Sequence, residues 1–303
     1  MKRNAIALLL TLFFMMLISV AISIGLENIT KTKNEIKKES FIIQSSIVID
    51  DVLSMLKNSP EVSAITKDET PASFFAFLSS SSFIPLDLEN YKISIKIKSA
   101  RDRFNINALK DSNSTISQTR FAIFKEYLIN HQIDEALAYM IIDSMLGIKE
   151  DMTYYSDIFF KKPELFRDYI ASANHLETIL KYYSNEYKDN VFKKLDFEKF
   201  LTFDKDINTK IDLNQASVET WEFLLGCSKQ RAEDIVKNAG LYQSLDDIGL
   251  DDAEKERLSN FSTSFLEPVV KVSIEISDEE LYGKIEFLYD LKKKKGYNFV
   301  YTI

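Results

Sequence analysis

The strongest constraint on this chain is an uncharged apolar segment close to its N-terminus. Residues 5–26 have the sequence AIALLLTLFFMMLISVAISIGL and contain no Asp, Glu, Lys or Arg. As an α-helix they would be about 33 Å long, which is enough to cross the hydrocarbon core of a bilayer. The segment exceeds the apolar region of a typical cleaved signal, and no A-x-A site follows it. We therefore expect a permanent, single-pass membrane anchor.

The flanking residues bear on which side of the membrane the rest of the chain occupies. Lys2 and Arg3 precede the segment, whereas lysines and glutamates are mixed after it. The count of positive residues on the two sides is therefore ambiguous, but the very short N-terminal tail favours an N-terminus inside the cell. We expect everything after Leu26 to lie outside the cytoplasm.

The anchor is predicted to continue as a long helix. No Pro or Gly occurs between Glu27 and Lys57. One helix of about fifty residues would be apolar in its first half and amphipathic in its second. Such a helix suits side-by-side packing with related helices, which favours a filament subunit. The apolar residues that recur at helical spacing are Ile29, Ile36, Ile43, Ile47, Val48, Val52, Leu53 and Leu56.

The remaining sequence predicts strands on both sides of a helical region. Residues 91–98 alternate apolar and polar without exception, and the period of two returns after Pro268. Between them the spacing indicates helices that begin near Ser117, a suitable N-cap, and that include residues 163–200. Pro60 and Pro71 would end the long helix, and Ser79–Ser82 would form a loop.

These patterns predict an α+β fold. A pilin-like long N-terminal helix would pack on a small antiparallel sheet, with a large, mostly helical domain inserted into it. Residues 27–110 would hold the outer half of the helix and the first part of the sheet. Residues 111–264 would form the inserted domain, and residues 265–303 would complete the sheet.

Composition and motifs argue against an enzyme. The chain has only two histidines, His131 and His175, and one cysteine, Cys227. It contains no G-x-S-x-G, Walker A, H-E-x-x-H or G-x-G-x-x-G motif. We therefore expect no enzymatic activity, with His131 at a helix boundary and Cys227 in the core. The net charge of −8 also lowers the expectation of nucleic-acid binding.

Residues 211–248 have the pattern of a helix-hairpin-helix. Asn214 or Ser217 could cap a first helix that ends at Gly226, and a second helix would start at Ser228. DNA-binding versions usually have two glycines in the turn, but Ser228 stands at the second position, and nearby charges nearly cancel. The pattern favours a packing module over DNA binding. A membrane-anchored DNA-binding protein of the competence or DNA-uptake type remains the alternative.

One acidic stretch could be compared with a calcium loop. Asp204, Asp206, Asn208 and Asp212 match four of its positions. The glycine and the final glutamate of such a loop are replaced by Thr and Gln, so a solvated acidic turn is the preferred interpretation.

Three stretches resemble the minor pseudopilin K of type II secretion systems (general secretion pathway protein K). Residues 3–10, RNAIALLL, are similar to that family's R-G-V-A-L-L prepilin start. Residues 102–109, DRFNINAL, are similar to its G-R-F-N-L-N-A-L, and residues 211–216, IDLNQA, to its I-N-V-N-T-A. The order and spacing of these stretches extend over nearly the whole chain. The second stretch is the most specific.

The resemblance implies processing of the N-terminus. Residues 1–5 would be a prepilin leader cut after Ala5, where the family usually has Gly, and Ile6 would become the N-methylated first residue. Residues 6–26 would then be the transmembrane part of the helix. Most pseudopilins have Glu at the fifth mature residue, whereas this chain has Leu10. K-type subunits lack this Glu, which is thought to place them at the filament tip.

The resemblance also implies ligand and structural residues. Family members bind calcium through an acidic stretch whose ends match Asp143, Glu150 and Asp151, although its D-x-D centre is missing here. Calcium is the only cofactor implied. Phe104 is expected to close the junction between sheet and helical domain, and Asn105 and Asn107 to satisfy backbone groups where the strand ends.

The resemblance therefore implies a tip subunit of the periplasmic pseudopilus that initiates or caps assembly for protein export. The chain would sit in the bacterial inner membrane with its bulk in the periplasm. Its expected partners are the minor pseudopilins of the I and J types, the inner-membrane assembly platform and the prepilin peptidase, with no nucleic acid.

Overall fold

The computed structural model describes residues 31–33, 35–88, 91–149 and 153–302. Residues 5–26, with Ala5, Ile6 and Leu10, lie outside these ranges, as do Glu150 and Asp151. Among the helices of the described part, none combines the length and the hydropathy needed to cross a bilayer.

A long helix opens the described chain, over residues 31–33 and 35–58. Two short helices follow, α2 (Pro60–Asp68) and α3 (Pro71–Ser81), each with a proline in its first turn. Ser59 and Thr70 cap them by accepting hydrogen bonds from the backbone N–H groups of Val62 and Ser73. The predicted helix boundaries at Pro60 and Pro71 are thus confirmed.

The predicted loop at Ser79–Ser82 is wrong for its first three residues, which belong to α3. The reason is local hydrogen bonding. Ser79 Oγ donates to the Phe75 carbonyl, and Ser80 Oγ donates to the Phe77 carbonyl, both at 2.9 Å. These bonds satisfy the hydroxyls within the helix, so a run of serines does not end it.

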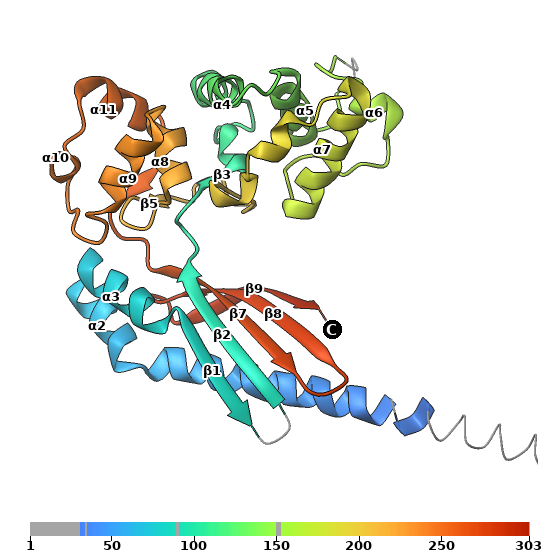
Figure 1. Cartoon of the computed structure of the whole chain (residues 1–303), viewed down its shortest axis with the longest axis vertical. Helices are drawn as coiled ribbons and strands as arrows, with labels where there is room; N and C mark the ends of the chain where they lie inside the picture. The colour runs from blue at the N-terminus through green and yellow to red at the C-terminus, as the bar shows by residue number, and fades with distance from the viewer. Residues whose placement is uncertain (1–30, 34, 89–90, 150–152, 303) are drawn as a thin grey trace, which may run out of the picture.

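A five-stranded antiparallel sheet lies against the long helix, in the order β1-β2-β7-β8-β9 (Figure 1). The alternation in residues 91–98 is confirmed as β2, whose Ile93, Ile95 and Ile97 are buried, and the period of two after Pro268 is confirmed as three strands. The first strand was not predicted. The bounds are β1 (Phe83–Leu88), β2 (Tyr91–Ser99), β7 (Val269–Ser277), β8 (Tyr282–Asp290) and β9 (Lys295–Thr302).

The helical lobe is inserted between β2 and β7 and lies beyond the end of the sheet, away from the start of the long helix (Figure 1). Most of residues 163–200 are not α-helical. Only Ala173–Tyr187 is, followed by two short 3₁₀ turns. The α-helices of the lobe are α4 (Gln118–Asn130), α5 (Ala136–Met145), α6 (Ile158–Lys161), α7 (Ala173–Tyr187), α8 (Val218–Leu225), α9 (Lys229–Val236), α10 (Leu245–Ile248) and α11 (Asp252–Leu258).

Two separate hydrophobic cores match this arrangement. One joins the long helix, α2 and α3 to the sheet and draws its buried residues from 41–97 and 270–291. The other fills the lobe, with buried residues from 104–261. Short parallel strand pairs support the lobe, β3 (Phe104–Asn105) with β4 (Leu201–Thr202) and β5 (Ile211–Asp212) with β6 (Thr263–Ser264). The predicted α+β fold class is confirmed.

Candidate assembly face and interdomain junction

The long helix has two apolar stripes on opposite sides. Phe41, Val48, Val52 and Leu56 are buried against the sheet. Ile36, Ile43 and Ile47, spaced seven and four residues apart, share the opposite side and are 48–61% exposed. We call these three isoleucines the outer stripe. The sequence pattern had placed residues of both stripes in a single apolar series.

The outer stripe is chemically simple, because it offers methyl and methylene groups and no hydrogen-bonding partner. Burying one such side chain contributes about 1.5–3 kcal/mol. Exposed apolar side chains that share one side of a helix are typical of a protein or membrane contact. The arrangement suits binding of another helix.

The chain passes between sheet and lobe twice, and the two passages lie side by side. The N–H of Ala100, just after β2, donates to the carbonyl of Val269, the first residue of β7, at 2.9 Å. Arg101 then forms an ion pair with Asp204 of the lobe at 3.1 Å, and its guanidinium also donates to the hydroxyl of Tyr297 in β9 at 3.4 Å. Arg101 therefore connects the lobe to the sheet.

The chain then continues into the lobe with Phe104, Asn105 and Asn107. The Phe104 ring is 5.0 Å from that of Phe223 and packs edge-on against Phe261, inside the core of the lobe. The Asn107 side chain accepts from the Ile170 N–H and donates to two carbonyls, while Asn105 Nδ2 donates to the Asp206 carbonyl at 2.9 Å. All of these bonds satisfy backbone groups, so none of the three residues presents a ligand-binding group.

Asn214 is a hub of the lobe and not a helix cap. Its Oδ1 accepts from the N–H groups of Gly240 and Tyr242, and its Nδ2 donates to the carbonyls of Tyr242 and Phe265, at 2.8–3.0 Å. The cap of α8 is Ser217, whose Oγ accepts from the Thr220 N–H at 3.1 Å. Of the two alternatives for this cap, the structure selects Ser217.

Asp212 is a junction residue that sequence analysis did not single out for this role. Its N–H donates to the Arg101 carbonyl, and its carboxylate accepts from the N–H groups of Asn214 and Glu267. The side chain is fully buried, and burial raises the pKa of its carboxyl to about 7. The only sequence signal was an acidic residue within an apolar stretch.

The helix-hairpin-helix prediction corresponds to α8, a short turn and α9. Gly226 ends α8 with φ +64°, in the left-handed region, and its N–H donates to the Glu222 carbonyl at 2.8 Å. Ser228 caps α9. The basic groups here face carboxylates: Arg231 pairs with Glu254 at 3.0 Å, and Arg257, whose guanidinium lies against Gly226, pairs with Glu126 at 2.9 Å. This pairing favours packing over phosphate binding.

Asp143, the described residue of the implied calcium site, is buried in α5. Its carboxylate accepts from the N–H groups of Tyr155 and Ser156 and from the Ser156 hydroxyl, at 2.7–3.1 Å. Burial is the largest influence on its pKa and raises it. In the described residues, the Asp143 carboxylate holds the loop at 155–156. Calcium binding by Asp143 is not tested by these contacts and stays a prediction. Calcium binding by Glu150 and Asp151, which lie outside the described residues, stays a prediction.

Other ionisable groups do not converge. His131 ends α4 as predicted and contacts Tyr127, whereas His175 lies in α7, where burial lowers its pKa. Asp204, in the acidic stretch compared with a calcium loop, is paired with Arg101. Within the ranges that the structure describes, no group of three or more His, Cys, Asp or Glu residues is placed to hold a metal.

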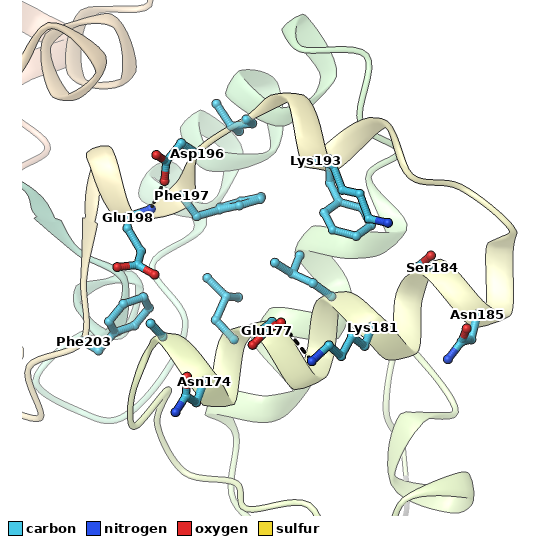
Figure 2. Close-up of a pocket in the computed structure, with 15 residues that line it drawn as sticks. Asn174, Glu177, Lys181, Ser184, Asn185, Lys193, Asp196, Phe197, Glu198 and Phe203 are labelled. Carbon is cyan, nitrogen blue, oxygen red and sulfur yellow. Dashed lines mark hydrogen bonds and ion pairs between the residues drawn. The ribbon is translucent and has the colours of Figure 1, made fainter. Parts of the chain in front are cut away.

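A groove of about 820 Å³ lies between α7 and residues 192–203 (Figure 2). Its lining includes the apolar Leu176, Leu180 and Phe203, and Glu177, also in the lining, pairs with Lys181 at 2.9 Å. No histidine or cysteine lines it. The groove is large enough to hold a small ligand, and its charged lining residues are Glu177, Lys181, Lys193, Asp196 and Glu198.

The fold matches a solved structure over most of the chain, although no family model and no curated protein matches the sequence. The match is to a chain in the crystal structure of the GspK-GspI-GspJ complex from the type 2 secretion system of enterotoxigenic Escherichia coli. It covers 88% of this chain and 97% of that chain, with a TM-score of 0.57 and 14% identity. At this identity the likeness establishes a shared fold.

Proposed function

We propose that this chain is a minor pseudopilin of a type II secretion system, equivalent to the K-type subunit. The observation that carries the proposal is the fold match to a chain of a complex named for three such subunits, over nearly the full length of that chain. The three sequence stretches that resemble the K family support the same assignment, because they are features of the sequence and do not depend on the fold match.

The outer stripe supplies the assembly contact. Ile36, Ile43 and Ile47 stand away from the chain's own sheet, so they can pack against the helix of a neighbouring subunit without disturbing the core. The proposed neighbours are the I-type and J-type minor pseudopilins. The apolar residues 5–26 would hold the chain in the inner membrane, with its bulk in the periplasm, until assembly extracts it.

The proposed place of the subunit is the tip of the pseudopilus, where it initiates or caps the filament. The lobe lies past the end of the sheet farthest from the start of the long helix, so a subunit stacked above would meet the lobe (Figure 1). Leu10 adds to this, because it leaves no acidic side chain at the fifth mature residue to pair with the N-terminal amine of a subunit above. Calcium, the prepilin peptidase and the assembly platform remain proposed partners of the chain.

The decisive experiment places the full-length chain in membranes together with the I-type and J-type subunits of the same host. We expect the three proteins to co-purify after detergent extraction. The double substitution Ile43→Asp with Ile47→Asp should lower recovery of the partners at least tenfold, because it would bury charges against an apolar helix.

The matched control is Phe160→Asp. Phe160 is an equally exposed large apolar residue, but it lies on α6 of the lobe, and its substitution should leave recovery unchanged. Absence of any complex with the wild-type chain, or equal losses in the stripe and control variants, would overturn the proposal.

A further inference from the structure

The two edges of the sheet differ in how they are protected. β1 forms one edge and carries Pro85, which has no N–H to offer a further strand, as well as Asp87. β9 forms the other edge, and its residues Phe299–Thr302 include neither a proline nor a charged residue. Prolines and charges are common devices that keep edge strands from pairing with other chains. β1 has them, and the end of β9 does not.

The backbone of β9 is open along that end. A register irregularity between Glu286 and Leu288 accompanies the left-handed conformation of Asn298, with φ +55°. After it, Val300, Tyr301 and Thr302 pair regularly with β8. Among the strands that the structure describes, β9 pairs only with β8, so the outward backbone groups of this short stretch have no strand partner.

Three of the four side chains of Phe299–Thr302 are large, apolar and exposed. Phe299, Val300 and Tyr301 are 37–57% exposed. The Phe299 ring stacks on the buried Phe287 ring at 4.9 Å and is followed by Tyr301 at 6.4 Å. The resulting row of aromatic rings leads from the core to the open edge, where a further apolar side chain could extend it.

We propose that an extended segment of a pilin-like partner subunit adds to the sheet as a sixth strand beside Phe299–Thr302. The occupant must be extended, because only a strand satisfies a row of backbone N–H and C=O groups at this spacing. The inference rests on the proposed function for the identity of the partner, but it concerns a surface distinct from the outer stripe.

Charges at the two ends of the edge indicate the composition of the added strand. The turn before β9 carries Lys293 and Lys294, and β9 itself starts at Lys295. The turn before β8, beyond the other end of the edge, carries Asp278 and Glu279. An apolar strand with an acidic residue at the lysine end and a basic residue at the other end would complement both.

Hydrogen exchange tests strand addition directly, because it reports on backbone N–H groups. The full-length chain is compared alone and in the complex with the I-type and J-type subunits. The exchange rate of peptides from β9 should fall at least tenfold in the complex. The exchange rate of peptides from β1 should not change. Equal exchange of β9 with and without the partners would overturn the inference.

A pair of edge variants supplies the second measurement. Val300→Lys should weaken association at least tenfold, whereas Phe83→Lys, at a similarly exposed position on β1, should not. Circular dichroism melts should be alike for both. Equal affinities of the two variants, or protection of β9 by self-association of this chain alone, would contradict the inference. If the wild-type chain forms no complex at all, it is the proposed function that fails.

Discussion

The carboxylate of Asp212 accepts a hydrogen bond from the backbone N–H of Glu267 at 2.9 Å. Glu267 lies where the chain leaves the lobe for β7. The Asp212 N–H donates to the carbonyl of Arg101, where the chain enters the lobe from β2. A single buried residue therefore holds both passages between the sheet and the lobe.

Replacing Asp212 by Ala should destabilise the protein by about 2–4 kcal/mol, because the N–H groups of Glu267 and Asn214 would be left buried without acceptors. Urea unfolding followed by circular dichroism measures the loss. The exposed Asp206→Ala, next in the same acidic stretch, serves as control and should cost under about 1 kcal/mol. A loss at Asp212 no larger than that of the control would show that the junction does not depend on it.

The same residue predicts a pH dependence of stability. The pKa of Asp212 is about 7 in the folded protein because of burial, against an ordinary value near 3.8 when unfolded. The folded state therefore binds the extra proton, and the contribution of this group is full below about pH 4 and is lost as the pH rises through about 7. Unfolding free energies at pH 5 and pH 8 should show a fall of about 2–4 kcal/mol from this group. In Asp212→Asn that part of the slope should disappear.

Asp143→Ala should also destabilise the protein by about 2–4 kcal/mol, since three donors from Tyr155 and Ser156 would lose their acceptor. Melting curves with calcium and with EDTA should show the same loss. A clearly larger loss in calcium would identify Asp143 as a ligand. The same melting curves test the other two residues. If calcium stabilises the wild-type chain through Glu150 and Asp151, the gain in melting temperature from calcium should shrink in Glu150→Gln and in Asp151→Asn.

Gly240→Ala should loosen the contact between the lobe and α3. An added Cβ would lie 2.6 Å from Cγ of Phe75, and the backbone already has φ +87°. The matched control is Gly249→Ala, where φ is +67° but no atom lies within 4 Å of the new Cβ. Both changes should cost about 1–2 kcal/mol for the left-handed backbone, and Gly240→Ala about 1–3 kcal/mol more for the clash. Thermal melts of the two variants measure the difference, and equal melting temperatures would show that Phe75 moves away freely.

The prediction of N-terminal processing concerns Ala5 and Ile6, which lie outside the described residues. If the chain is cut as a prepilin, mass spectrometry of the membrane-extracted protein should find Ile6 as the first residue, with an N-methyl group. Ala5→Gly should not reduce processing, since Gly is the usual residue at that position. An intact Met1 in cells that contain an active prepilin peptidase would contradict the assignment.

Strands were predictable from the sequence where buried and exposed side chains alternate along the strand. Residues 91–98 show this alternation because Ile93, Ile95 and Ile97 all face the long helix. β1 lacks it, because an edge strand with Pro85 and an exposed Leu86 has no consistently buried face. The serines of α3 were also mispredicted, for a different reason. Their hydroxyls donate to carbonyls within the helix, and the sequence alone does not show whether a serine does so.

The residues of the candidate surfaces could be identified only from the tertiary structure. Ile43, Ile47 and Val48 all satisfy helical spacing, and only the position of the sheet decides that Val48 is buried while the other two are exposed. Asp212 presents the same difficulty, because its importance comes from Arg101 and Glu267, which lie far from it in the sequence. The resemblance located the IDLNQA stretch, but it could not say which of its side chains ties the two parts of the molecule together.

The pairing of Ser99 with Val270 has a consequence for the modularity of the molecule. These residues sit opposite each other in neighbouring antiparallel strands, so the whole lobe occupies the place of a β-hairpin turn. Excising it and joining β2 to β7 by a few residues would restore an ordinary meander. It would uncover Phe75 of α3 and Tyr297 of β9, which lie against the lobe and its junction. The lobe thus interrupts the chain at a single turn, while all pairings of the five-stranded sheet are formed outside it.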